Sequence, residues 1–144
     1  MWGILIGILS GALMSIQGVF NTEVTKHAGM WITAGFVQLF AFVVCVIAWF
    51  VTGRDGSVSE LVHMQPKYML LGGAIGAFIT YTVVASMNQI GPARSVMFIV
   101  ASQLIVAYII ELCGIFGVEK QQFELQKLIG LIVMIIGIVT FKWE

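Results

Sequence analysis

A carboxylate and an amide lie inside one apolar run of the chain, at Glu111 and Gln103. The run covers residues 95–118, so Glu111 would lie roughly 7 Å along a helix from the middle of the run, near Val106. An acid at the centre of a membrane helix costs roughly 2.5–3.5 kcal/mol. Because burial favours the neutral form of a carboxyl group, such an acid can also carry a proton. Glu111 is therefore a candidate for substrate binding or proton coupling.

Polar side chains extend along the same predicted helix. Steps of four residues separate Gln103, Ala107 and Glu111, which places them on one face, with Ser102 beside them. Arg94 begins this helix roughly 25 Å from Glu111, so it could reach Glu111 only in an antiparallel copy of the chain. The alternative for Glu111 is an acid paired with Arg94 or a loop lysine, which would hold two helices together.

Three other apolar segments each carry polar groups that need a partner. Gln17 and Asn21 are one helical turn apart near the amino terminus, and Gln38 lies in the second segment. An unpaired amide is costly in an apolar environment, so each must face protein, water or substrate. Tyr81 lies near the middle of the third segment, where it could line a path or pack in the interior.

The composition excludes an ordinary soluble domain. Of 144 residues, 60% are hydrophobic and 10% charged, and the mean hydropathy is +1.03, whereas soluble domains carry roughly 25% charged residues. Seven basic and seven acidic side chains cancel, which argues against a nucleic-acid partner. No catalytic triad, metal-ligand cluster or phosphate loop is visible, so we expect no enzyme, metal or cofactor. The lipid bilayer is the expected surroundings.

The apolar segments predict an all-α, polytopic membrane protein in which residues 1–144 form one membrane domain. At roughly 20 residues per span, five segments are long enough to cross a bilayer. The opening "MWGILIGILSGALM" lacks a basic start and a cleavage site, so we interpret it as a retained span. The connectors are "TKHAG", the "GRDGSVSELVHMQPK" stretch, Gly91-Pro92 and "GVEKQQFELQK". The predicted spans lie near 2–24, 30–52, 67–89, 92–115 and 126–143.

Small residues and tryptophans mark how these spans would pack and end. Small residues recur every fourth position in the first and third spans, and such stripes let membrane helices approach closely. Tryptophans fall near predicted helix ends, as interfacial anchors do. The stripes are Gly3, Gly7, Gly11, Ser15 and Gly72, Gly76, Thr80, and the tryptophans are Trp2, Trp31, Trp49 and Trp143.

The loop charges predict a weak preference for one orientation or insertion in both orientations. An excess of Lys and Arg on cytoplasmic loops normally sets the orientation of a membrane protein. With five spans, four basic residues share the side of the amino terminus and three lie on the other. Such a chain could pair with an inverted copy of itself and form both halves of a transporter; a parallel oligomer is the alternative. The two groups are Arg54, Lys67, Lys120, Lys127 and Lys26, Arg94, Lys142.

Three blocks of sequence resemble the YdcZ-like family, small bacterial members of the drug/metabolite transporter superfamily. They are "GVFNTEVTKHAGMWITAGFVQLFAF", preceded by Gln17, then "VASQLIVAYIIELCGIFG" and "KLIGLIVMIIGIV". The family pattern is matched by Gln17-x-x-x-Asn21, Ser102-Gln103 and Glu111-x-x-Gly114, although Cys113 replaces a more usual aromatic and Glu111 a commoner Asp. Members resemble halves of larger ten-helix transporters.

The resemblance implies a multi-pass protein of the bacterial inner membrane that transports a small molecule. We expect substrate to bind between two inverted subunits near Asn21, Gln103 and Glu111, with alternating access and proton coupling through Glu111. The alternative is a membrane accessory or assembly subunit that transports nothing. The identity and charge of the substrate stay open.

Overall fold

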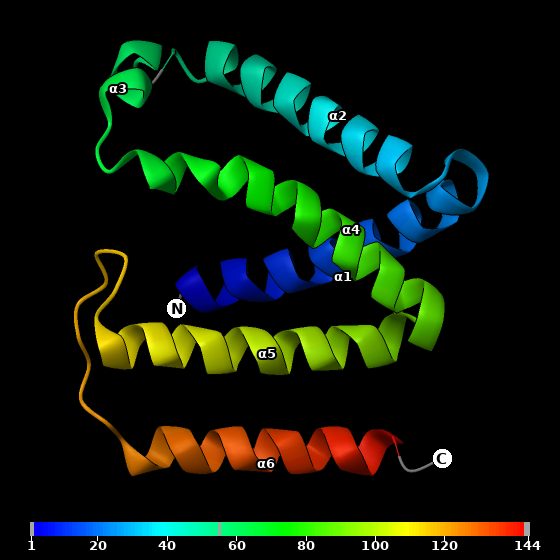
Figure 1. Cartoon of the computed structure of the whole chain (residues 1–144), viewed down its shortest axis with the longest axis vertical. Coiled ribbons are helices and arrows are strands. Elements are labelled where there is room, and N and C mark those ends of the chain that lie inside the picture. The colour runs from blue at the N-terminus through cyan, green and yellow to red at the C-terminus, as the bar shows by residue number, and fades with distance from the viewer. Residues whose placement is uncertain (1, 55, 143–144) are drawn as a thin grey trace. The chain divides into compact units, whose positions relative to one another are not determined.

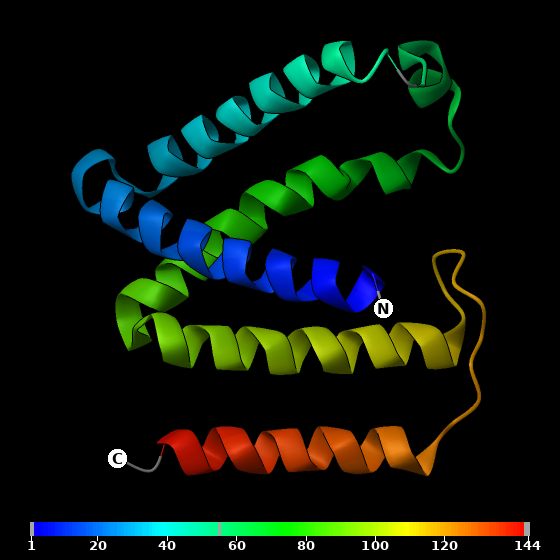
Figure 2. The same ribbon diagram turned by 180° about the vertical axis from the view of Figure 1, so that it is seen from behind.

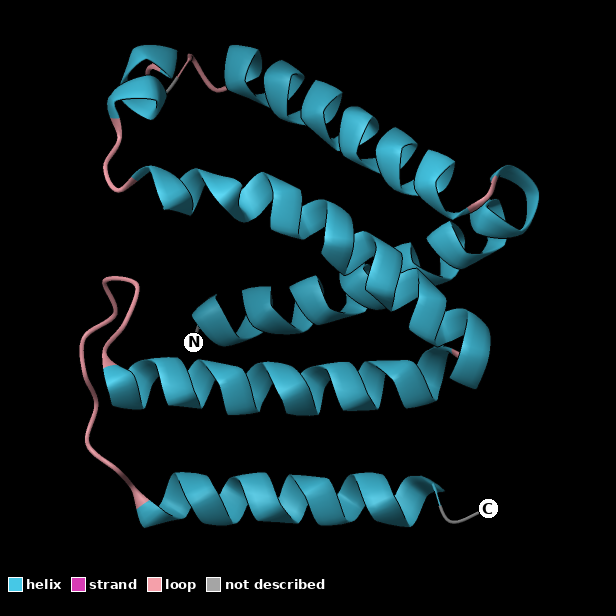
Figure 3. Ribbon diagram, viewed as in Figure 1, coloured by secondary structure: helices cyan, strands magenta, loops and turns pink. Residues whose placement is uncertain are grey.

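The computed structural model describes residues 2–54 and 56–142, and every regular element in these ranges is a helix (Figure 3). Trp143, predicted as an anchor and as the end of the last span, lies outside the described residues. The elements are α1 (Trp2–Ala28), α2 (Met30–Val51), α3 (Val58–His63), the 3-10 helix η1 (Lys67–Leu71), α4 (Gly72–Ile90), α5 (Pro92–Cys113) and α6 (Leu125–Lys142).

The chain forms two compact units, residues 1–89 and 90–144. In the first unit, α1 and α2 contact each other and are joined at Gly29, the point where the chain reverses (Figure 1). Gly29 has φ +82°, a conformation that favours glycine. Helix α1 continues four residues beyond its predicted end, and the Thr25 hydroxyl donates to the Asn21 carbonyl within it. The expected "TKHAG" connector is therefore helical except for Gly29.

Helix α1 packs against α4 at Gly18. A Cβ on Gly18 would lie 2.5 Å from Cε of Met87, and Met87 itself is buried. The predicted stripe on α1 makes no such approach, since a Cβ on Gly3, Gly7 or Gly11 would meet nothing within 4 Å among the described residues. The close approach between these helices therefore depends on a different glycine from the ones that the stripe indicated.

Helix α2 contacts α4 through one polar pair and two aromatic pairs, in which Trp31 meets Phe78 and Tyr81. The Gln38 amide donates to the Thr80 hydroxyl over 3.5 Å, beside Gly76, where a Cβ would lie 3.3 Å from the same amide nitrogen. About two turns earlier on α2, the Trp31 ring stacks on Tyr81 with centroids 4.6 Å apart. The predicted small-residue stripe of the third segment thus packs at Gly76 and Thr80.

The polar connector before α4 includes a short helix within its described residues. It contains the short helix α3, whose amino end is capped by the Ser57 hydroxyl accepting from the Ser59 amide over 3.2 Å. The third predicted span begins with the 3-10 turn η1 and continues as α4 to Ile90.

In the second unit, α5 and α6 lie side by side and run in opposite directions, as both ribbon views show (Figures 1 and 2). Pro92 occupies the first turn of α5, where its missing N–H costs nothing. Gly114 ends α5 in the left-handed conformation with φ +63°. Residues 114–124 then connect the carboxyl end of α5 to the amino end of α6.

The helices expose apolar side chains, as expected for a protein solvated by lipid. Among the described residues, the buried hydrophobic side chains are few, and large ones such as Phe36 and Ile75 are more than half exposed. Four helical segments are long and apolar enough to cross a membrane: α1, α2, Lys67–Ile90 and α5. The predicted fifth span, α6, is a shorter apolar helix of 18 residues, or about 27 Å.

Candidate functional site

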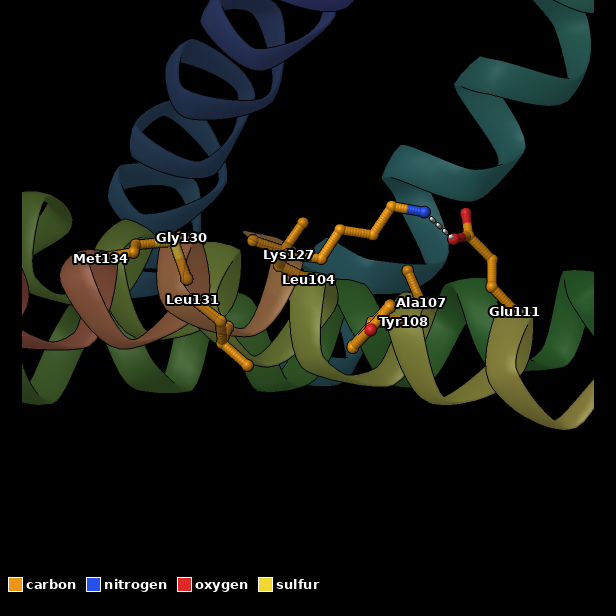
Figure 4. Close-up of a pocket in the computed structure, with 8 residues that line it drawn as sticks. All are labelled: Leu104, Ala107, Tyr108, Glu111, Lys127, Gly130, Leu131 and Met134. Carbon is orange, nitrogen blue, oxygen red and sulfur yellow. Dashed lines mark ion pairs between the residues drawn. The ribbon is translucent and has the colours of Figure 1, made fainter. Parts of the chain in front are cut away.

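A cavity of about 500 Å³ lies between α5 and α6 in the second unit (Figure 4). Its size is in the range of about 300–1,000 Å³ that is typical of small-molecule sites. The lining is mostly apolar, and the exceptions are one carboxylate, one ammonium group and one phenol. The lining residues are Leu104, Ala107, Tyr108 and Glu111 from α5, and Lys127, Gly130, Leu131 and Met134 from α6.

Lys127 lies between two carboxylates. Its Nζ atom is 4.0 Å from Oε2 of Glu111 and 3.3 Å from Oε1 of Glu124. Figure 4 shows the Lys127 side chain reaching from α6 toward Glu111 on α5. The side chains of Glu111 and Lys127 are 44% and 40% exposed, so neither is enclosed by the protein. The pair with Glu124 is the shorter of the two.

Tyr108 fixes the start of α6 against α5. Its hydroxyl donates to the Glu124 carbonyl over 3.4 Å and accepts from the Glu124 amide over 3.2 Å. The same carbonyl accepts from the amides of Lys127 and Leu128, at the first turn of α6. Glu124 is therefore tied to both helices through its backbone, which places Lys127 one turn further on, facing Glu111.

The connecting segment folds back over the end of α5. The backbone N–H of Gln121 donates to the backbone carbonyl of Glu111 over 2.9 Å. At the helix end, a Cβ on Gly114 would lie 2.8 Å from Cβ of Lys120. Only glycine suits this position, because the backbone is left-handed and the loop passes so close. These contacts hold the loop against the carboxyl end of α5, near Glu111.

The structure separates the polar residues that were predicted to share one face of α5. Ala107 and Glu111 line the cavity, whereas Gln103 and Ser102 are exposed and do not line it. Arg94 is exposed in the first turn of α5. Within one chain, the cation that pairs with Glu111 is Lys127.

The predicted residues of the first unit lie in helix contacts or on the surface. Asn21 is buried at 8% exposure, whereas Gln17, one turn before it, is exposed. Gln38 is half-buried and bonded to Thr80. Tyr81 is half-buried under the Trp31 ring.

Lys127, Glu124 and Tyr108 were not among the predicted site residues. Glu124 lies in the predicted connector, Lys127 lies where that connector overlaps the predicted span 126–143, and Tyr108 lies in the apolar run 95–118. A signal was present in the spacing, because Glu124 and Lys127 are three residues apart at a helix start, and so are Tyr108 and Glu111 on α5.

Comparisons with known proteins indicate that the chain is a membrane protein. The model of a family described as "Putative inner membrane exporter, YdcZ" matches residues 2–140. The inner membrane protein YdcZ of Escherichia coli (strain K12) is 23% identical over 132 residues, covering 90% of this chain and 87% of that protein. No solved structure matches the chain. Together with the apolar helices, these matches identify a multi-pass protein of the inner membrane.

Proposed function

We propose a transport function for this chain, which belongs to the YdcZ family of inner-membrane proteins. It would export a small solute as a secondary transporter of the drug/metabolite type. The observation that supports this most is the cavity between α5 and α6, in which an apolar lining surrounds one charged pair. Ionisable groups inside membrane segments commonly mark substrate or proton pathways.

Two oppositely inserted copies would form the transporter. The basic residues of the loops divide four against three, which gives little preference for one orientation. Inverted halves with a site between them are a common plan of secondary transporters. This arrangement needs α6 to cross as the fifth span. Its 18 residues and its antiparallel packing on α5 are compatible with a crossing of about 27 Å.

Glu111 would couple the solute to protons. It is half-exposed to the cavity and paired with Lys127 over a long 4.0 Å distance, so solute or a proton can displace the lysine. Because solute and proton compete for one carboxylate, the transporter would move one of them outward only in exchange for the other moving inward. The side chains of Gln103 and Asn21 would contact solute only in the assembled dimer.

The proposal is tested without knowing the solute. Inside-out vesicles that contain the wild-type chain or Glu111→Gln are incubated with a small-molecule extract of the cells under an imposed pH gradient. Mass spectrometry then measures the vesicle contents. We expect at least one solute to accumulate only with the wild-type chain and to be lost when an uncoupler removes the gradient. Identical contents in the two preparations would remove the coupling role of Glu111, and contents equal to those of vesicles without the chain would overturn the transport proposal.

A second candidate is an accessory or assembly subunit, because the Glu111–Lys127 pair joins two helices of one chain and could serve packing alone. In that case Glu111→Gln lowers the stability of the protein and changes no vesicle content. A matched control is Glu119→Gln, which removes the same charge from the exposed connecting loop.

A further inference from the structure

The charged cluster of the second unit has one negative charge left over. Glu111 and Glu124 share a single cation, Lys127, so the three ionised groups sum to −1. Lys127 lies closer to Glu124, at 3.3 Å, than to Glu111, at 4.0 Å. Glu111 is thus the less well neutralised carboxylate, and it is the one that lines the cavity.

The rest of the cavity lining is suited to the apolar part of a ligand. Leu104, Ala107, Leu131 and Met134 offer no charge, and Gly130 leaves room beside them. The Tyr108 ring already has the Lys127 ammonium at 5.9 Å from its centroid, within the range of a cation–π contact. The lining therefore complements a molecule with one positive charge and an aromatic or aliphatic body.

We propose that the cavity binds an organic monocation, and that Lys127 occupies the position of its positive group when the cavity is empty. This inference rests on the proposed transport function and adds the substrate class. The ligand's cationic group pairs with Glu111, and Lys127 shifts fully to Glu124. Because Tyr108 holds the Glu124 backbone against α5, the shift is a side-chain movement that leaves both helices in place.

The opposite assignment is an anion bound by Lys127. Two probes of similar size separate them: benzyltrimethylammonium and benzenesulfonate. Binding of each to the full chain in nanodiscs of neutral lipid is measured by calorimetry. We expect the cation to bind and benzenesulfonate to bind weakly or not at all. Tighter binding of benzenesulfonate, or no binding of the cation to correctly folded protein, overturns the proposal.

The role of Lys127 is tested by removing it. Lys127→Gln removes the ammonium group that competes with the ligand for Glu111. The cation should therefore bind about two- to fivefold tighter, the change expected for a partly exposed ion pair. Lys120→Gln removes the same charge from the adjoining loop and should change the affinity less than about twofold. Glu111→Gln should abolish cation binding. Unchanged or weaker binding in Lys127→Gln refutes the proposed competition.

Glu124 should act only through Lys127. Glu124→Gln returns Lys127 to Glu111, so the cation should bind more weakly than to the wild type. In the Lys127→Gln background, the same Glu124→Gln change should have little effect on affinity. An equal effect in both backgrounds would mean that Glu124 acts by its charge alone, which contradicts the exchange.

The outcomes separate the two proposals. If the cation binds and the variants change its affinity as predicted, but no solute accumulates in vesicles, the assignment of the cavity to a cation stands and the transport proposal is refuted. Accumulation that depends on Glu111 but involves only neutral or anionic solutes would retain transport and overturn the cation assignment.

Discussion

Replacing Glu111 by Gln should remove function and leave stability nearly unchanged. The carboxylate lies 4.0 Å from the Lys127 ammonium, and both side chains are about two-fifths exposed. At that distance two charges attract by about 1 kcal/mol in water. Exposed pairs contribute about 0.2–1 kcal/mol once side-chain entropy is included. Lys127 also keeps its closer partner, Glu124, in the variant. The free energy of unfolding should therefore fall by less than about 1 kcal/mol.

The measurement is reversible unfolding in detergent, followed by circular dichroism, for the wild type, Glu111→Gln and the control Glu119→Gln. The two variants should differ in unfolding free energy by less than about 1 kcal/mol, while only Glu111→Gln abolishes solute accumulation in vesicles. A loss of about 3 kcal/mol or more in Glu111→Gln would show a desolvated structural pair. That result would refute the assignment of Glu111 to a wet cavity and favour the accessory subunit.

Two further predictions concern close backbone approaches. Gly18→Ile should destabilise the chain by about 1–3 kcal/mol, because the new side chain meets buried Met87. Gly11→Ile, with open space around it, should lower the unfolding free energy far less in the same assay. Equal losses would contradict the α1–α4 contact. Gly114→Ala should cost more than Gly117→Ala, since both have positive φ but only Gly114 has Lys120 against it. The difference should be about 1 kcal/mol or more in unfolding free energy, and a larger loss in Gly117→Ala would contradict the loop geometry.

The helices could be predicted because a continuous apolar run in lipid can satisfy its backbone only as a helix. Their ends were less predictable. Thr25 and His27 look like loop residues, yet α1 continues through them until Gly29 provides the positive φ that reverses the chain. Similarly, the stripe through Gly3 and Gly7 indicated close packing within a chain or between chains, and within the chain the close contact occurs at Gly18. Which small residue is used depends on where two helices cross, and spacing within one helix does not contain that information.

The candidate site was predicted in part. Glu111 stands out because an acid in an apolar run is costly, so its type and depth single it out. Lys127 was one of several loop lysines that could pair with Glu111, and its type alone does not single it out, since a lysine beside a polar loop is ordinary. Its pairing with Glu111 depends on the loop folding back and on Tyr108 binding the Glu124 backbone. Both are contacts between segments, which no local pattern reports.

The proposed transporter depends most on one chain forming both of its halves, and the orientation of the carboxyl terminus tests this directly. Two fusions at that end are compared in cells, one to a protein fluorescent only in the cytoplasm and one to an enzyme active only outside it. We predict comparable signals from both fusions, because four basic residues oppose three. Signal from only one fusion, at matched expression, would contradict the inverted dimer.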